Sequence, residues 1–355
     1  MKTAGRLSSD LADRIRRVAE VRTDEPVVIS LYVNLDPTDF GRQAARDAQI
    51  ESLIDRARSD DAFGTLSHDA KAILDRDLER VRTWAKESMD PSGVRGVALF
   101  CSTEADLFES FRLSAPVGPD ITVGTTANLE PLIAALPGDA WCVFLVNRKT
   151  DRIMRGSRER LIETTSTSEE VHGQHDQGGW SQARYQRSVE KDVKDHVQHA
   201  CDRLFTAFQH TPFDHLIIGC PDELRPELES KLHAYLRERL VQFVDAEVEH
   251  EGAEDVLERV RPEIEQYERR AETELLDRLS ERLGRGERAV SGLAAVSDAL
   301  DQQRVEVLLV AANAREAVMP DLIQRCILQA AVVRYVRYHE PERALGGPVA
   351  ALLRF

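Results

Sequence analysis

The chain has no hydrophobic run that is long enough to cross a membrane. Its longest apolar stretches, "CVFLV" and "VEVLLVAA", fall far short of the roughly 20 residues that a membrane-spanning helix needs. The N-terminal stretch "MKTAGRLSSDLADRIRR" lacks the apolar centre of a secretory signal. We therefore expect a cytoplasmic protein.

Cysteine is also scarce. The 355 residues include five cysteines, an odd number, and no two of them have the spacing of metal ligands. All five lie in apolar stretches: Cys101, Cys142, Cys201, Cys220 and Cys326. This pattern predicts reduced cysteines in the core and excludes a disulfide framework. At Cys220 it favours a structural thiol over a nucleophile.

Several motifs of nucleotide-binding and hydrolytic enzymes are missing. No G-x-G-x-x-G follows a strand, no Walker lysine is present, and there is no G-x-S-x-G elbow. His172 and His175 are three residues apart and Asp176 follows them, but no second cluster of ligands accompanies them. The sequence therefore predicts no cofactor and no metal site.

Acidic residues outnumber basic ones. The chain has 62 Asp and Glu against 47 Lys and Arg, which gives a net charge of −15. This charge argues against non-specific coating of nucleic acid, because nothing in the chain as a whole attracts phosphate. Any binding of RNA would need a local basic patch.

The length predicts more than one domain, and the hydrophobic content of 42% is enough to fill their cores. A Pro-Gly break at Pro137 and a long charged helical pattern from Asp255 to Gly284 suggest the boundaries. We expect three domains: an N-terminal α/β domain at 1–137, a middle domain at 138–258 and a C-terminal interaction domain at 259–355.

Alternating helical and strand patterns predict an α/β (α+β) fold with a mixed sheet in the middle domain and a C-terminal α/β sandwich. In the middle domain, "AWCVFLVN" and "DRIMRGSRERLIETT" are expected to form the two strands of a hairpin. A helix from Val189 onward has one apolar stripe, and "FDHLIIGC" is typical of a strand buried on both faces. A further helix, "ELRPELESKLHAYLRERL", precedes the strand "VQFVDAEVE".

The stretch "HGQHDQGGWSQARYQRSVEKD", from His172 to Asp192, lies between the hairpin and this helix. A Gly-Gly pair is often only a turn, yet a long loop inside a compact domain is commonly functional. Basic residues recur after the glycines in steps of three and four: Arg184, Arg187, Lys191 and Lys194. If the helix reaches back that far, they form one cationic stripe that suits contact with phosphate.

The alternative for this stripe is pairing within the helix. Glu190 with Lys194 and Lys191 with Asp195 have the i,i+4 spacing of ion pairs. The two arginines have no acidic residue four positions away, so this alternative accounts for the lysines alone.

The motif "GGWSQARYQR" resembles the Gly-Gly-Gln loop of the archaeal and eukaryotic class-I peptide-chain release factors. Ser181, Arg184, Tyr185 and Arg187 occupy the family's serine, arginine, aromatic and arginine positions. The C-terminal "LGGPVAALLRF" is similar to the last strand of the same superfamily, and "VSGLAAVSDALDQQRVEVLLV" is similar to the helix and strand that open its last domain.

Two departures refine this resemblance. Trp180 stands at the family's glutamine position, and Gln182 follows two places later. This spacing is closer to the Gly-Gly-Ser-Gln loop of the Vms1-like peptidyl-tRNA hydrolases, with one inserted residue. The chain also has no Asn-Ile-Lys-Ser element of the kind that reads stop codons. The resemblance points to a bacterial or archaeal relative that does not decode.

The resemblance implies a ribosome-associated hydrolase that cleaves the ester of peptidyl-tRNA. Gln182, Gly178 and Gly179 would then be catalytic, Trp180 and Ser181 would support the loop, and the cationic stripe would contact RNA. The partners would be the ribosome, through its large-subunit rRNA, and peptidyl-tRNA, with a translational GTPase or another protein at the C-terminal domain.

The alternative is a non-catalytic ribosome-binding hibernation or rescue factor of Balon type. Trp180 favours this alternative, whereas Gly178, Gly179 and Gln182 favour the hydrolase.

Overall fold

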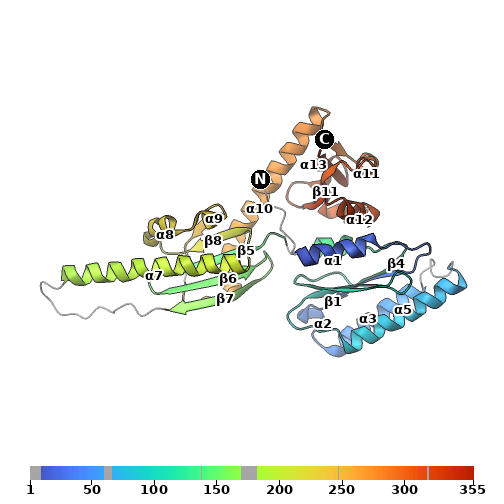
Figure 1. Cartoon of the computed structure of the whole chain (residues 1–355), viewed down its shortest axis with the longest axis horizontal. Helices are drawn as coiled ribbons and strands as arrows, with labels where there is room; N and C mark the ends of the chain where they lie inside the picture. The colour runs from blue at the N-terminus through green and yellow to red at the C-terminus, as the bar shows by residue number, and fades with distance from the viewer. Residues whose placement is uncertain (1–8, 60–65, 137, 169–181, 247, 318–319) are drawn as a thin grey trace. The chain divides into compact units, whose positions relative to one another are not determined.

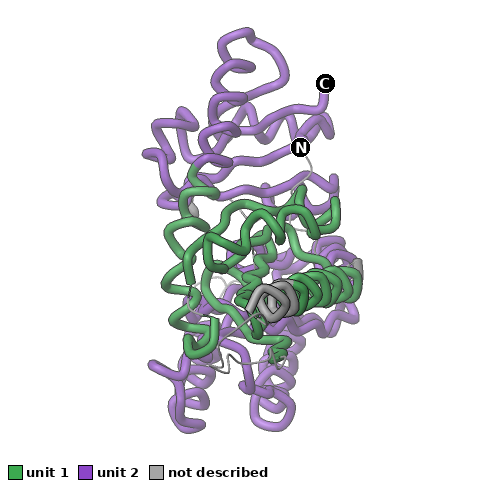
Figure 2. The backbone as a smooth tube through the Cα atoms, turned by 90° about the vertical axis from the view of Figure 1, so that its left-hand side faces the viewer, with its two compact units in different colours: residues 1–6, 137–269 green, residues 7–136, 270–355 purple. Residues whose placement is uncertain are grey.

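A computed structural model describes residues 9–59, 66–136, 138–168, 182–246, 248–317 and 320–355. The chain forms two compact units: unit 1 holds residues 1–6 and 137–269, and unit 2 holds residues 7–136 and 270–355 (Figure 2). Unit 1 has one five-stranded sheet and unit 2 has two four-stranded sheets, all with helices packed on them. The predicted α/β class is confirmed, and the domain limits near 137 and 258 stay predictions.

The N-terminal part of unit 2 is a four-stranded antiparallel sheet in the order β3-β2-β1-β4 (Figure 1). Helices α3 and α5 pack on one face, and α1 and α6 pack on the other. The elements are α1 Ser9–Glu20, β1 Val28–Asn34, α2 Pro37–Phe40, α3 Gln43–Ser59, α5 His68–Glu87, β2 Gly96–Ser102, β3 Leu107–Leu113, β4 Asp120–Gly124 and α6 Glu130–Ala135.

The C-terminal part of unit 2 is the predicted α/β sandwich, with strand order β10-β13-β11-β12. Helices α11 and α12 cover one face, and the second half of α10 covers the other. The elements are β10 Ala289–Ser291, α11 Leu293–Asp301, β11 Val305–Ala311, η2 Ala312–Ala317, α12 Pro320–Leu328, β12 Val332–Val336, α13 Pro341–Leu345 and β13 Val349–Leu353.

Helix α1 joins these two parts of unit 2, although they are far apart in the sequence. Ile15 and Val18 belong to the same buried cluster as Ile323 and Cys326 of α12. The amide of Gln324 donates a hydrogen bond to the carbonyl of Ala19 at 2.6 Å. Unit 2 therefore has a core that neither terminal part could complete by itself.

Unit 1 is built on a mixed sheet in the order β7-β6-β5-β8-β9 (Figure 1). Strands β5, β6 and β7 are antiparallel neighbours, and β8 is parallel to both β5 and β9. The elements are β5 Trp141–Val146, β6 Thr150–Gly156, β7 Leu161–Ser168, α7 Gln182–His210, β8 His215–Gly219, η1 Asp222–Leu224, α8 Arg225–Lys231, α9 Ala234–Arg237 and β9 Leu240–Val244. The predicted mixed sheet is confirmed.

Two predictions for unit 1 are wrong in detail. The stretch "DRIMRGSRERLIETT" is two strands, because a tight turn reverses the chain after Gly156. A Cβ at that position would lie 1.9 Å from the carbonyl oxygen of Arg160, so the turn requires a glycine. The expected helix of residues 223–240 is interrupted at His233, whose side chain caps the short helix α9.

The predicted connecting helix is α10, Ala253–Gly284. Its first half buries Val256, Val260 and Ile264 in unit 1, and its second half buries Leu279 in unit 2. The helix is thus part of both cores. No helix in the described ranges is long and apolar enough to span a membrane.

Candidate functional site

The predicted loop helix is α7, which begins at Gln182 and contains 29 residues. At 1.5 Å per residue it is about 43 Å long. Arg184, Arg187, Lys191 and Lys194 therefore lie within one helix, as a single stripe requires. The loop residues Gly178, Gly179, Trp180 and Ser181 lie outside the described residues, as do His172, His175 and Asp176 and the side chains of residues 182–190.

The described side chains of α7 pack against the sheet from Val193 onward. Val193 is the first of its described side chains to contact the core, and Val197, Ala200 and Leu204 are fully buried. Eleven residues of α7 precede Val193, which corresponds to about 16 Å of helix. Figure 1 shows this end of α7 extending past the strands of its own unit. The helix is therefore a projecting stalk.

The packed half of α7 is fixed by a buried ion pair. Arg203 of α7 donates to both carboxylate oxygens of Asp151 on β6, at 3.2 Å from Nε and 2.5 Å from Nη2. Asp151 is fully buried, whereas the Arg203 side chain is 29% exposed. This pair was not predicted from the sequence, although a lone Asp in a stretch of strand pattern was a signal for it.

Arg155 of β6 provides a second attachment, because its guanidinium donates to backbone carbonyls where α7 ends. Its partners are Ala207 at 3.4 Å, Pro212 at 3.2 Å, and Thr211. Thr211 and Pro212 directly follow the last residue of α7, so these contacts attach the end of the helix to β6. Burial lowers the pKa of Arg155 from its ordinary value.

The strand that leads to the loop is the edge strand β7. Ser168, its last residue, is paired with Thr150 of β6. Arg152 of β6 is buried and donates to both carboxylate oxygens of Glu163 at 3.1 and 2.5 Å. These hydrogen bonds lower the pKa of the Glu163 carboxyl. Both ends of the loop are therefore attached to ordered elements, one by β-pairing and one by the stalk.

The two lysines of the stripe, Lys191 and Lys194, are exposed on the stalk. Within the part of the chain that the structure describes, neither forms an ion pair, and this includes the i,i+4 pair of Lys191 with Asp195. The side chain of Glu190, the partner expected for Lys194, lies outside the described residues.

The cysteines of unit 1 are not suited to nucleophilic attack. Burial raises the pKa of the Cys220 thiol to about 11, and those of Cys142 and Cys201 to about 12. Almost no thiolate would exist at neutral pH. In the described ranges, no group of three or more His, Cys, Asp or Glu residues is arranged to hold a metal ion.

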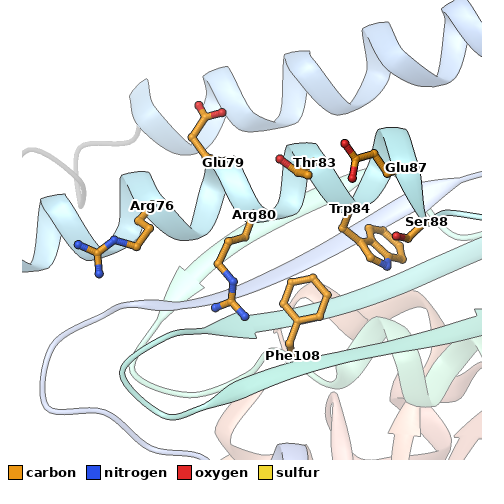
Figure 3. Close-up of a pocket in the computed structure, with 8 residues that line it drawn as sticks. All are labelled: Arg76, Glu79, Arg80, Thr83, Trp84, Glu87, Ser88 and Phe108. Carbon is orange, nitrogen blue, oxygen red and sulfur yellow. The ribbon is translucent and has the colours of Figure 1, made fainter.

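Unit 2 has an open groove between α5 and the edge strand β3 (Figure 3). Trp84 and Phe108 line it, and the Arg80 guanidinium lies 4.9 Å from the centroid of the Phe108 ring. Arg80 also donates to Asp77 at 3.1 Å and to Thr103 at 2.7 Å. These contacts stabilise α5 against β3, and the groove contains none of the predicted site residues.

Comparison with known proteins links the stalk region to release factors. Residues 128–265 match the bacterial archaeo-eukaryotic release factor family 10, and this segment contains the loop and all of α7. The match covers less than half of the chain. It supports the resemblance of this segment to release factors. No curated protein sequence matches the chain.

Solved structures similar to the chain include archaeal translation factors. The archaeal translation termination factor aRF1 is 19% identical, with 98% of this chain and 97% of that chain covered and a TM-score of 0.29. Pelota of Archaeoglobus fulgidus is 18% identical, with 73% and 79% covered and a TM-score of 0.34. A chain in a model of ribosome-bound archaeal Pelota and ABCE1 is 15% identical, with 100% and 95% covered and a TM-score of 0.45.

Proposed function

We propose that this protein acts in the cytoplasm as a ribosome-associated peptidyl-tRNA hydrolase that releases nascent chains from stalled complexes without decoding a stop codon. The observation that carries the proposal is a Gly-Gly-x-Ser-Gln motif placed where an anchored, projecting helix begins. The match to a release-factor family over the same residues supports it.

The geometry suits a substrate that lies inside a narrow cavity. The ester between a nascent chain and its tRNA lies deep within RNA, so the reactive group must be carried on a thin support. A helix that extends past the strands of its own unit is such a support (Figure 1), and glycines allow the backbone to approach the substrate closely. The ion pair of Arg203 with Asp151 would hold the direction of this support.

Ester hydrolysis at such a site does not require a strong base. A positioned water and a stabilised oxyanion are sufficient to promote it. The amide of Gln182 offers both a donor and an acceptor for these tasks. The first N–H groups of a helix lack partners within the helix and carry partial positive charge, so the start of α7 would add donors for a developing negative charge.

The non-catalytic alternative, a hibernation or rescue factor of Balon type, is supported by Trp180 at the family's glutamine position. It would retain the stalk and the stripe for binding the ribosome but would leave the ester intact. The two functions differ in one assay: release of a labelled peptide from peptidyl-tRNA on stalled ribosomes or free large subunits.

We also propose that the C-terminal sandwich docks a translational GTPase or another protein. Among known proteins, we propose the Vms1-like hydrolases as the nearest functional parallel.

The glycines are expected to matter for shape and not for stability. Replacing both Gly178 and Gly179 with alanine should lower peptide release while the melting temperature stays nearly unchanged, because a loop contributes little to the core. Differential scanning fluorimetry measures the second quantity. A large fall in melting temperature would identify the pair as a structural turn instead.

The arginines are expected to bind RNA. Reversing both, Arg184→Glu and Arg187→Glu, should weaken binding to ribosomes or tRNA and reduce the salt slope by about one for each phosphate contact that is lost. Circular dichroism should not change. A matched control reverses Arg285 and Arg343, which are 68% and 85% exposed on unit 2. Equal binding by the stripe variant and the wild type across a salt titration would show that the stripe is only a solvated face.

A further inference from the structure

Three aromatic rings lie next to one another in series on the surface of unit 1. Phe205 of α7 lies against His233 with ring centroids 3.9 Å apart and planes at 19°, and His233 lies 5.2 Å from Tyr235 at 39°. We name Phe205, His233 and Tyr235 the ring ladder. Phe205 is half-buried, His233 is exposed, and Tyr235 is 57% exposed. The ladder thus leads from the core to solvent.

Local structure holds the ladder in place. His233 caps α9, and its Nδ1 accepts a hydrogen bond from the backbone N–H of Tyr235 at 3.3 Å. Leu232 and Leu236, on either side, are buried in the core that α7 shares with α8 and α9. The backbone that carries His233 and Tyr235 is therefore held as a fixed turn.

The ladder continues the face of α7 that carries the exposed lysines. From Lys191, residues on the same helical face follow at three, seven and fourteen positions, namely Lys194, Gln198 and Phe205. The exposed Asp195 and Asp202 also lie on this face, at four and eleven positions. The distance along the helix from Lys191 to Phe205 is about 21 Å. Two lysines and two carboxylates thus precede the rings on this face, so any contact with RNA would depend on stacking of bases on the rings and not on the local charge.

The side chains around the ladder favour RNA over a protein partner. In the described part of unit 1, the exposed large hydrophobic side chains are Tyr235 and Ile162, so no broad apolar patch surrounds the rings. Arg237 is exposed near the ladder, and its Nη2 donates to the carbonyls of Glu229 and Leu232 at 2.8 and 3.2 Å. A narrow aromatic platform beside a guanidinium fits a planar base and its phosphate better than it fits an amphipathic helix.

We infer that the ring ladder is a stacking site for an unpaired nucleobase of single-stranded RNA, on the same face of α7 as Lys191 and Lys194. The inference deepens the proposed function, since it names a second point of contact with RNA on the unit that carries the loop. Tyr235 would stack on the base with its ring, and its hydroxyl would not be needed.

The test uses the full chain and a fluorescent twelve-residue oligoadenylate, with binding followed by anisotropy at a fixed low salt concentration. Tyr235→Ala should weaken binding by about 5- to 150-fold, the usual loss when one stacking ring is removed. Tyr235→Phe should bind as the wild type does. Ile162→Ala, at the other exposed apolar side chain, should have no effect. The salt slope should be equal in all four proteins, because no phosphate contact is lost.

Several results would overturn the inference: no binding by the wild type, unchanged binding by Tyr235→Ala, an equal loss in Tyr235→Phe, or competition by duplex RNA as strong as that by the single strand. If Tyr235→Ala binds RNA as the wild type does but binds RNA-free ribosomal proteins more weakly, the ladder is a site for a protein partner. The oligonucleotide contains no peptidyl ester, so failure here leaves the hydrolase proposal standing, and a failed release assay leaves this result standing.

Discussion

Gln182→Ala is expected to lower the rate of peptide release by about 10²–10³ while ribosome binding persists. This is the usual loss when one positioned donor to a developing oxyanion is removed. Gln182 follows the Gly-Gly pair and is the residue at which α7 begins. A single-turnover assay with labelled peptidyl-tRNA on large subunits measures the rate, and sedimentation with ribosomes measures binding.

Gln177→Ala is the matched control for this experiment, because it removes the same amide from the same loop on the other side of the glycines. It should leave the rate near that of the wild type. Unchanged release by Gln182→Ala would sink the assignment and would leave Gln177 or Gln174 as the candidate.

Arg203→Met is expected to lower the free energy of unfolding by about 3–5 kcal/mol, since it leaves a fully buried carboxylate without its partner. Arg203 is the residue that donates to both oxygens of Asp151. Methionine keeps the length of the side chain, so the loss should come from the unpaired charge more than from lost packing. Urea denaturation followed by circular dichroism measures the effect.

A double variant separates charge from packing. Asp151→Val with Arg203→Met removes both charges and should regain most of the stability, because well-packed apolar residues often replace a buried ion pair with little cost. Arg343→Met is the control, since its ion pair with Glu340 is exposed and should contribute less than about 1 kcal/mol. A single variant Arg203→Met as stable as the wild type would mean that the pair does not anchor the stalk.

The strands and helices with strong periodicity could be predicted from the sequence. The continuous apolar run of "FDHLIIGC" indicated a strand buried on both faces, and β8 lies between two parallel neighbours. The long charged pattern from Asp255 onward indicated one helix, and α10 is that helix. Helix α1 was not predicted, although Leu11, Ile15 and Val18 have helical spacing.

Features that depend on three-dimensional contact could not be predicted from spacing. The turn after Gly156 reverses the chain inside what reads as one strand, and its only sequence signal is the glycine itself. The pairing of Asp151 with Arg203 joins residues 52 positions apart. The shared core of α1 and α12 joins segments more than 300 residues apart, so no local pattern could indicate it.

For the candidate site, spacing indicated the stripe and the structure shows the helix that carries it. The extension of α7 back to Gln182 could not be settled from the sequence, because the apolar stripe begins only at Val189. The positions of the ring-ladder residues in the sequence gave no hint of stacking. Phe205 lies on α7 and His233 precedes α9, and the two rings meet because Leu232 and Leu236 are buried beside α7.

The most direct test of the central claim is peptide release by the wild-type chain. Purified protein is added to large ribosomal subunits that carry peptidyl-tRNA with a labelled peptide, and free peptide is measured over time against a buffer control. The account predicts that the amount of released peptide rises in proportion to the wild-type protein added. Gln182→Ala should not produce this release. Stable binding to the subunits with release no faster than in buffer would contradict it and would favour the non-catalytic ribosome-binding factor.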